Sequence, residues 1–225
     1  MSFSVAIHES LAKAYRVVAV LFLPPARSRG VIEEKGLAAL LRESGESLLL
    51  SPCMETGEAL KELGMALEEC LGSEECWHEF NYDMTVNAIT AARKVPCPLY
   101  ESTYRIGGKN RLIAAPAISE DLQRYYARIG LEASEGQGVT VDHITVELEF
   151  LAALHEAEAR MLQGSYPPDL VEELRSMRRG FLAEHALAWM PQAASCLEER
   201  AATPLLRGLA RALRALLDCE GLLYA

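Results

Sequence analysis

The stretch Val141–Leu162, VDHITVELEFLAALHEAEARML, has the residue spacing of an amphipathic α-helix. Successive side chains of a helix are about 100° apart around its axis, so residues three or four apart share a face. The apolar face would carry Ile144, Leu148, Leu151, Leu154 and Leu162. The solvent face would carry Thr145, Glu149, Glu156, Arg160 and Gln163. The stretch therefore predicts a helix over residues 142–163 that packs one face against a core.

Two acidic residues of this helix, Glu147 and Glu158, fall near the centre of its apolar face. A buried carboxylate needs hydrogen bonds or a cation, because bare burial is costly and raises its pKa. His143 precedes Glu147 by one turn, so the two side chains can meet. Asp142 stands where an N-cap or a first-turn acid would stabilise the start of the helix.

Asp142, His143 and Glu147 allow two interpretations. One is a ligand or catalytic cluster, and the other is an N-cap followed by a buried His–Glu pair that fixes the helix. A metal site needs three or four protein ligands, and no other His or Cys has matching local spacing. We therefore favour the structural interpretation and expect no metal site.

Helical spacing dominates the rest of the chain, whereas the alternating pattern of β-strands is nearly absent. Further helices are expected at about residues 5–22, 31–43, 56–71, 74–93, 119–130, 168–190 and 204–219. The last of these has Thr203 as its expected N-cap and Pro204 at its first position. The expected fold is all-α, a single helical domain of about 8–10 helices.

Two segments interrupt the helical pattern, Lys94–Ala117 and Leu131–Val141. The second is polar and rich in glycine, which is typical of a hinge. We expect this hinge, at about residues 131–141, to join an N-terminal part of about residues 1–130 to a C-terminal part of about residues 142–225. The domain over residues 1–225 would then consist of two helical subdomains.

Composition limits the classes of function. The 225 residues carry a net charge of −10, which disfavours binding to nucleic acid because its phosphates require Lys and Arg. The longest uncharged apolar run, Val17–Pro25, is too short to cross a bilayer and precedes no signal-cleavage motif, so neither a membrane span nor a secretory leader is expected. Six cysteines without CxxC or zinc-finger spacing indicate reduced, mostly buried thiols in a cytoplasmic protein.

The common catalytic motifs are missing from the sequence. It contains no phosphate-binding P-loop, no GxSxG nucleophile elbow and no HExxH zinc-protease motif. Gly136–Val141, GQGVTV, keeps only two glycines of a dinucleotide-binding loop and has no strand before it. His155 falls toward the apolar side of its helix and is expected to be an interior histidine. The sequence therefore favours a protein without catalytic activity.

Prolines and tyrosines are concentrated in Val95–Arg105, VPCPLYESTYR. Pro96 and Pro98 hold the backbone extended, which can present Tyr100 and Tyr104 on a rigid recognition loop. The alternative is a rigid connector whose tyrosines cover the core. The residues by themselves leave both interpretations open.

Three motifs together resemble the TorD/DmsD/NarJ family of chaperones that mature molybdenum-cofactor oxidoreductases. They are KVPCPLYESTYR at 94–105, VDHITVELEFLAAL at 141–154 and FLAEHALAWMPQAA at 181–194. AYRVVAVLFLPP at 14–25 is similar to the opening helix of that family. The motifs stand in the family order and span nearly the whole chain. They depart from the family pattern at Cys97 and Leu99, and Asn81–Lys94 lacks the usual Tyr-x-x-Leu-Phe stretch.

The resemblance assigns roles to residues of each motif. The family's loop, Asp-His pair and neighbouring aromatic residues imply a binding site for the client and its leader peptide, formed by Pro98, Leu99, Tyr100, Glu101, Ser102, Tyr104, Asp142 and His143. The remaining matched positions imply structural support, from Glu147, Phe150, His185, Trp189 and Pro191. Acidic residues beside an oily surface suit a leader that carries two arginines beside an apolar stretch, provided that the loop and the helix start are adjacent.

The implied function is that of a cytoplasmic chaperone without catalytic turnover. It would bind the twin-arginine leader and the apo-form of a molybdopterin oxidoreductase catalytic subunit, assist cofactor insertion and prevent premature export. No cofactor of its own is expected. The alternatives are a guanine-nucleotide-binding protein or weak GTPase, with GTP as its ligand, and a helical adaptor without leader specificity. A monomer and a domain-swapped homodimer both remain open.

Overall fold

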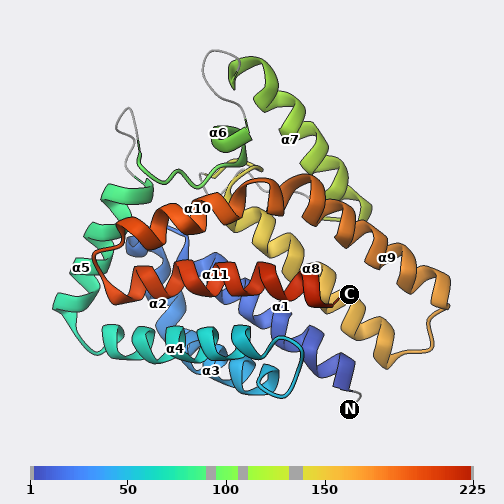
Figure 1. Cartoon of the computed structure of the whole chain (residues 1–225), viewed down its shortest axis with the longest axis horizontal. Coiled ribbons are helices and arrows are strands. Elements are labelled where there is room, and N and C mark those ends of the chain that lie inside the picture. Colours follow the sequence, from blue (N-terminus) through green and yellow to red (C-terminus); the bar gives the residue numbers. More distant parts are fainter. Residues whose placement is uncertain (1–2, 90–94, 106–110, 132–138, 224–225) are drawn as a thin grey trace.

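Helices make up most of the computed structural model, which describes residues 3–89, 95–105, 111–131 and 139–223 (Figure 1). In chain order the elements are α1 (Phe3–Leu21), α2 (Pro25–Glu34), α3 (Leu37–Leu48), α4 (Met54–Leu71), α5 (Glu74–Met84), the π-helical turn η1 (Thr85–Ile89), α6 (Glu101–Arg105), α7 (Arg111–Arg128), α8 (Ile144–Gln163), α9 (Pro168–Phe181), the π-helical turn η4 (Leu182–Ala186), α10 (Leu187–Arg200) and α11 (Pro204–Leu222). These described ranges contain no β-strand. The predicted all-α fold is confirmed.

Several helix boundaries differ from the prediction. The helix expected at 31–43 is two helices, because Gly36 adopts a left-handed φ of 58° that favours glycine. The segment expected to be irregular at 94–117 contains α6 and the first turns of α7. The helix expected to end before Pro191 continues to Arg200, because burial of α10 outweighs the low helix propensity of proline. Thr203 caps α11 as predicted, accepting a hydrogen bond from the Leu206 N–H.

The core lies where helices from both ends of the chain meet. α1 packs along α8 and α3, and α11 packs against α4 and α10 (Figure 1). The largest fully buried aromatic side chains of the core are Tyr15, Phe22, Phe80, Phe150, Phe181 and Trp189. The predicted division into two parts stays a prediction, because residues 132–138 of its hinge lie outside the described residues. Over the described ranges, no helix is both long enough and apolar enough to cross a membrane.

The helix α8 has the orientation expected from its sequence, with one exception. Glu147 and Glu158 are both buried, as predicted. Thr145 was expected to face solvent but is buried, because its hydroxyl donates to the Ala19 carbonyl of α1 at 3.1 Å. His155 is the interior histidine that the pattern indicated.

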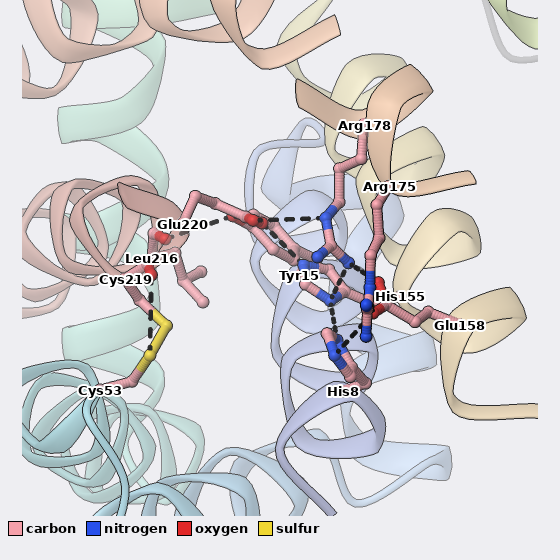
Figure 2. A network of polar contacts seen from close by, with 10 residues as sticks. All are labelled: His8, Tyr15, Cys53, His155, Glu158, Arg175, Arg178, Leu216, Cys219 and Glu220. Carbon is pink, nitrogen blue, oxygen red and sulfur yellow. Dashed lines mark hydrogen bonds and ion pairs between the residues drawn. A yellow bond between two sulfur atoms is a disulfide. The ribbon is translucent and has the colours of Figure 1, made fainter. Parts of the chain in front are cut away.

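A buried polar network joins α1, α8, α9 and α11 (Figure 2). At one end, Glu158 forms ion pairs with Arg175 at 2.7 Å and with Arg178 at 2.8 Å, and His8 lies 3.2 Å away. Burial opposes ionisation of Glu158, but the hydrogen bond to His8 and the charge of Arg178 lower its pKa to about 2. Figure 2 shows Arg178 between this carboxylate and the other half of the network.

The other half of the network is centred on His155. Its Nε2 lies 2.7 Å from Glu220, whose carboxylate also accepts a 2.9 Å hydrogen bond from the Tyr15 hydroxyl. Burial lowers the pKa of His155 to about 4, so the ring is neutral near pH 7. Because the ionised Glu220 carboxylate can only accept, the single ring proton resides on Nε2. The other nitrogen, Nδ1, then accepts a hydrogen bond from Arg178 at 3.0 Å. Burial opposes ionisation of Glu220, but the contacts of His155 and Arg178 lower its pKa to about 2.

Acidification below pH 4.5 is expected to destabilise the protein through Glu158 and Glu220. Both have a folded-state pKa of about 2, below the ordinary value of 4.5. The unfolded chain therefore takes up protons first as the pH falls, and stability present above pH 4.5 is lost progressively toward pH 2. Each glutamate contributes on the order of 2 kcal/mol to the loss between pH 4.5 and pH 2.5.

Urea denaturation at pH 4.5 and pH 2.5 measures this loss in the wild type and in Glu158→Gln. The variant has no carboxylate to protonate at this position, so its free energy of unfolding should change less between the two pH values. The comparison stays below pH 4.5 because Glu147, whose pKa burial raises, contributes in the opposite direction above that pH. The same pH dependence in both proteins would rule out this role for Glu158.

The six cysteines are paired, which corrects the prediction of reduced thiols. Cys70–Cys76 joins the end of α4 to α5. The other two disulfides link residues far apart in the sequence, Cys53–Cys219 with a separation of 166 and Cys97–Cys196 with a separation of 99. Local spacing could not indicate these pairs, because only the tertiary fold brings the partners together.

Candidate functional site

The loop with the Pro-Tyr motif and the start of α8 lie side by side. Tyr100 and His143 form an isolated antiparallel bridge, in which the Glu101 N–H donates to the Asp142 carbonyl at 2.9 Å. The Ile144 N–H donates to the Leu99 carbonyl at 2.9 Å. The rings of Tyr100 and His143 meet edge to face with centroids 4.8 Å apart. The predicted adjacency of the loop and the helix start is therefore confirmed.

His143, not Asp142, caps α8. Its Nδ1 accepts a 3.2 Å hydrogen bond from the Thr145 N–H, which requires a neutral ring. Burial lowers the pKa of His143 to about 4, against the opposing charge of Asp142, so the ring is neutral near pH 7. Asp142 instead accepts from the Ser102 N–H at 3.3 Å and also contacts the Thr140 hydroxyl. It holds the loop to α8.

Glu147 supports the site from inside the core. The expected His143–Glu147 pair is not what holds it: the carboxylate accepts a 3.1 Å hydrogen bond from the Trp189 indole N–H. Burial, followed by the charge of Glu101, raises the pKa of Glu147 well above its ordinary value. Burial therefore favours the neutral acid over the carboxylate form of Glu147, which reduces the cost of burying the side chain. This hydrogen bond links α8 to α10 beneath the loop.

The other predicted supporting residues also lie around this region. Phe150 packs against Phe181 with ring centroids 4.6 Å apart, and the Trp189 ring lies 5.5 Å from that of Tyr104. Pro191 is half-buried in α10, where its carbonyl accepts from the Ser195 hydroxyl at 2.9 Å. The contact between Tyr104 and Trp189 joins the loop to α10, and the contact between Phe150 and Phe181 joins α8 to α9.

Glu101 is enclosed by protein groups. Its side chain is 0% exposed, and both carboxylate oxygens face His185 Nδ1, at 3.0 and 3.1 Å. Arg105, one turn later in α6, forms an ion pair with the same carboxylate. The Glu101 carboxylate is therefore already neutralised, and His185 connects it to η4.

Burial divides the predicted binding residues into two groups. Leu99, Glu101, Ser102, Asp142 and His143 are buried. Pro98, Tyr100 and Tyr104 are half-buried and reach the surface. Burial raises the pKa of Tyr104 to about 12, so its phenol is neutral near pH 7. Pro98, Tyr100 and Tyr104 therefore contribute uncharged, largely aromatic surface to the loop, and the exposed cation Arg105 stands at its end.

Two further acidic residues near the loop were missed by the sequence analysis. Asp121 of α7 lies 3.2 Å from His185 Nε2, and Glu184 is exposed in η4. Arg105 donates to the Glu184 carbonyl at 2.8 Å, so Glu184 adjoins α6. Its position beside His185 in the motif at 181–194 was a usable signal, whereas nothing in the pattern around Asp121 distinguishes it.

Comparison with known proteins supplies the family. A scan against protein-family models matches residues 54–195 to the nitrate reductase delta subunit family. Searches of curated proteins and of solved structures found no significant match. The matched residues include the loop, the start of α8 and the η4–α10 segment, and they cover more than half of the chain. The chain therefore belongs to the nitrate reductase delta subunit family, the NarJ/TorD family of redox-enzyme maturation chaperones.

Proposed function

We propose that this chain is a chaperone that binds the twin-arginine leader and the apo-form of a molybdopterin oxidoreductase catalytic subunit. It would assist cofactor insertion and hold back export until insertion is complete. The observation that carries the proposal is the backbone bridge between Tyr100 and His143, which fixes an aromatic loop surface against a helix start. A surface held rigid in this way can bind a peptide at a lower entropic cost than a free loop.

The half-buried residues Pro98, Tyr100 and Tyr104 would contact the leader directly. Tyrosine rings suit a twin-arginine segment because a guanidinium ion stacks on an aromatic face while apolar residues pack against its edge. The buried members of the site, Leu99, Glu101, Ser102, Asp142 and His143, would maintain the shape of the loop. Beside the loop, two acidic residues remain accessible, Asp121 and Glu184. The net charge of −10 would also favour the approach of a cationic peptide.

The protein would act in the cytoplasm, where the precursor carries its leader before export. Disulfides are uncommon in reducing compartments, so the three pairs need an account. Reduction requires a thiolate to reach a sulfur atom, and Cys53, Cys219, Cys70 and Cys97 are all buried. Burial of both partners would slow reduction of Cys53–Cys219, whereas the half-buried Cys76 and Cys196 leave the other two disulfides more accessible.

Tyr100→Ala is expected to weaken binding of a synthetic twin-arginine leader peptide by about tenfold, the equivalent of ~1.4 kcal/mol. The variant removes the accessible ring while leaving the backbone bridge to His143 in place. Fluorescence anisotropy with the labelled peptide measures the dissociation constant. Circular dichroism establishes that the helical content is unchanged.

Tyr166→Ala is the matched control. Tyr166 is also exposed, but it follows the far end of α8, about 30 Å from His143 along a 20-residue helix. Its removal should leave peptide affinity unchanged. If neither Tyr100→Ala nor Tyr104→Ala alters the affinity, the loop is not the leader site. Equal binding of a scrambled peptide would identify an adaptor without leader specificity, and saturable binding of GTP in a parallel titration would favour the nucleotide-binding alternative.

A further inference from the structure

We propose that Asp121, Glu184 and His185 form a site for a divalent transition-metal ion such as Zn²⁺. Asp121 comes from α7, and the other two come from η4. One ligand atom of each residue lies within 4.8 Å of the ligand atoms of the other two. The site adjoins the leader-binding surface proposed above and includes its two acidic neighbours, Asp121 and Glu184, but the proposal of a metal ion does not depend on leader binding.

His185 is oriented as a metal ligand. Its Nδ1 lies 3.0 and 3.1 Å from the oxygens of Glu101, which is a carboxylate that can only accept when ionised. The ring proton is therefore on Nδ1, and the Nε2 lone pair points away from Glu101. Metal-binding histidines commonly donate their other N–H to a carboxylate in this way, which fixes the tautomer and makes the ring a better ligand.

The free nitrogen of His185 points into the proposed site. The side chain is only 1% exposed, and Nε2 has no hydrogen-bond partner. It lies 3.2 Å from an oxygen of Asp121. Two ligand atoms that are each about 2.0–2.2 Å from a metal ion are separated by about 3.0–3.5 Å, so this distance fits two ligands of one ion. Arg124 pairs with the other oxygen of Asp121 at 2.6 Å, so Oδ2 is the atom that faces Nε2. Without a cation or a ring proton between them, the Nε2 lone pair would face this carboxylate oxygen, which is unfavourable.

The surrounding structure holds the third ligand. Tyr125 donates a 2.8 Å hydrogen bond to the Glu184 carboxylate and so orients it. A Cβ atom at Gly180 would lie 2.8 Å from the Tyr125 hydroxyl oxygen, so glycine leaves room for this tyrosine. Glu184 and His185 are adjacent in a π-helical turn, and such turns are frequent at functional sites because the extra residue redirects side chains.

The ligand set indicates the class of ion. An imidazole nitrogen favours Zn²⁺ and related transition metals over Mg²⁺ and Ca²⁺, which prefer oxygen ligands alone. Three protein ligands leave a coordination position open for water or for a group from another molecule. The ion would tie α7 to η4, beside Glu101 of α6. The rival interpretation is a doubly protonated His185 that bridges Glu101 and Asp121 without any metal.

Isothermal titration of the chelator-treated full chain with ZnCl₂ tests the proposal, with MgCl₂ as the comparison. We expect saturable binding of one Zn²⁺ and no comparable binding of Mg²⁺. Asp121→Asn and Glu184→Gln should each weaken Zn²⁺ binding at least tenfold. Both residues reach the surface, so these variants should fold, and circular dichroism checks this. Zn²⁺ should also raise the melting temperature of the wild type more than that of either variant.

Glu120→Gln is the matched control. Glu120 is an exposed acid next to Asp121 on α7, outside the proposed ligand set. This variant should bind Zn²⁺ as the wild type does. Absence of saturable Zn²⁺ binding would overturn the proposal in favour of the doubly protonated histidine. Binding that is unaffected by Asp121→Asn and Glu184→Gln, or weakened equally by Glu120→Gln, would also overturn it.

Discussion

Replacing Arg178 with methionine is expected to lower the free energy of unfolding by about 3–5 kcal/mol at pH 7. Arg178 is 2% exposed and pairs with Glu158 at 2.8 Å, while its Nε lies 3.6 Å from Glu220. Removing this cation takes away part of the attraction that offsets the cost of burying the Glu158 and Glu220 carboxylates, whereas that desolvation cost remains. Methionine keeps most of the apolar length of the side chain, so the loss reports on charge more than on packing.

Arg175→Met provides the matched comparison for this prediction. Arg175 pairs with the same carboxylate at 2.7 Å, but its side chain is 35% exposed. Solvent screens a pair of this kind, so its removal should cost about 1 kcal/mol or less. Urea denaturation followed by circular dichroism measures both values. If both variants lose the same free energy of unfolding, the burial of Arg178 does not strengthen its contribution to stability.

Glu158 also illustrates what sequence could predict. Its place on the apolar face of α8 follows from helical periodicity, which is a local property, and the structure confirms its burial. Local periodicity could not name its partners, because His8, Arg175 and Arg178 come from two other helices. The same limit explains Thr145, whose buried position depends on the Ala19 carbonyl in α1.

The candidate site was accessible to sequence analysis only in part. The motif around Tyr100 and the motif around His143 were identified separately, and their adjacency depends on a backbone bridge between distant segments. Burial of Glu101 could not be foreseen, because its ion pair with Arg105 and its hydrogen bond with His185 form only in the folded chain. Asp121 is one of many acidic residues on polar helix surfaces, so its proximity to His185 was visible only in three dimensions.

Removing the Cys53–Cys219 disulfide is expected to lower the free energy of unfolding by about 4–5 kcal/mol. Cys53 precedes α4 and Cys219 lies near the end of α11, so the bond closes a segment of 166 residues. A cross-link over so long a segment strongly restricts the unfolded chain and thereby raises its free energy. Urea denaturation of the oxidised wild type and of the double variant Cys53→Ala/Cys219→Ala, without reductant, measures the difference.

Cys70→Ala/Cys76→Ala is the control, because its disulfide spans only six residues. The same entropic argument assigns it about 2 kcal/mol, so the two double variants should differ by ~2–3 kcal/mol. Both remove two thiols, so lost side-chain volume largely cancels in the comparison. Reductant should lower the stability of the wild type toward that of the variants. If Cys53→Ala/Cys219→Ala is as stable as the oxidised wild type, Cys53 and Cys219 are not bonded in solution. The prediction of reduced thiols would then be correct for that pair.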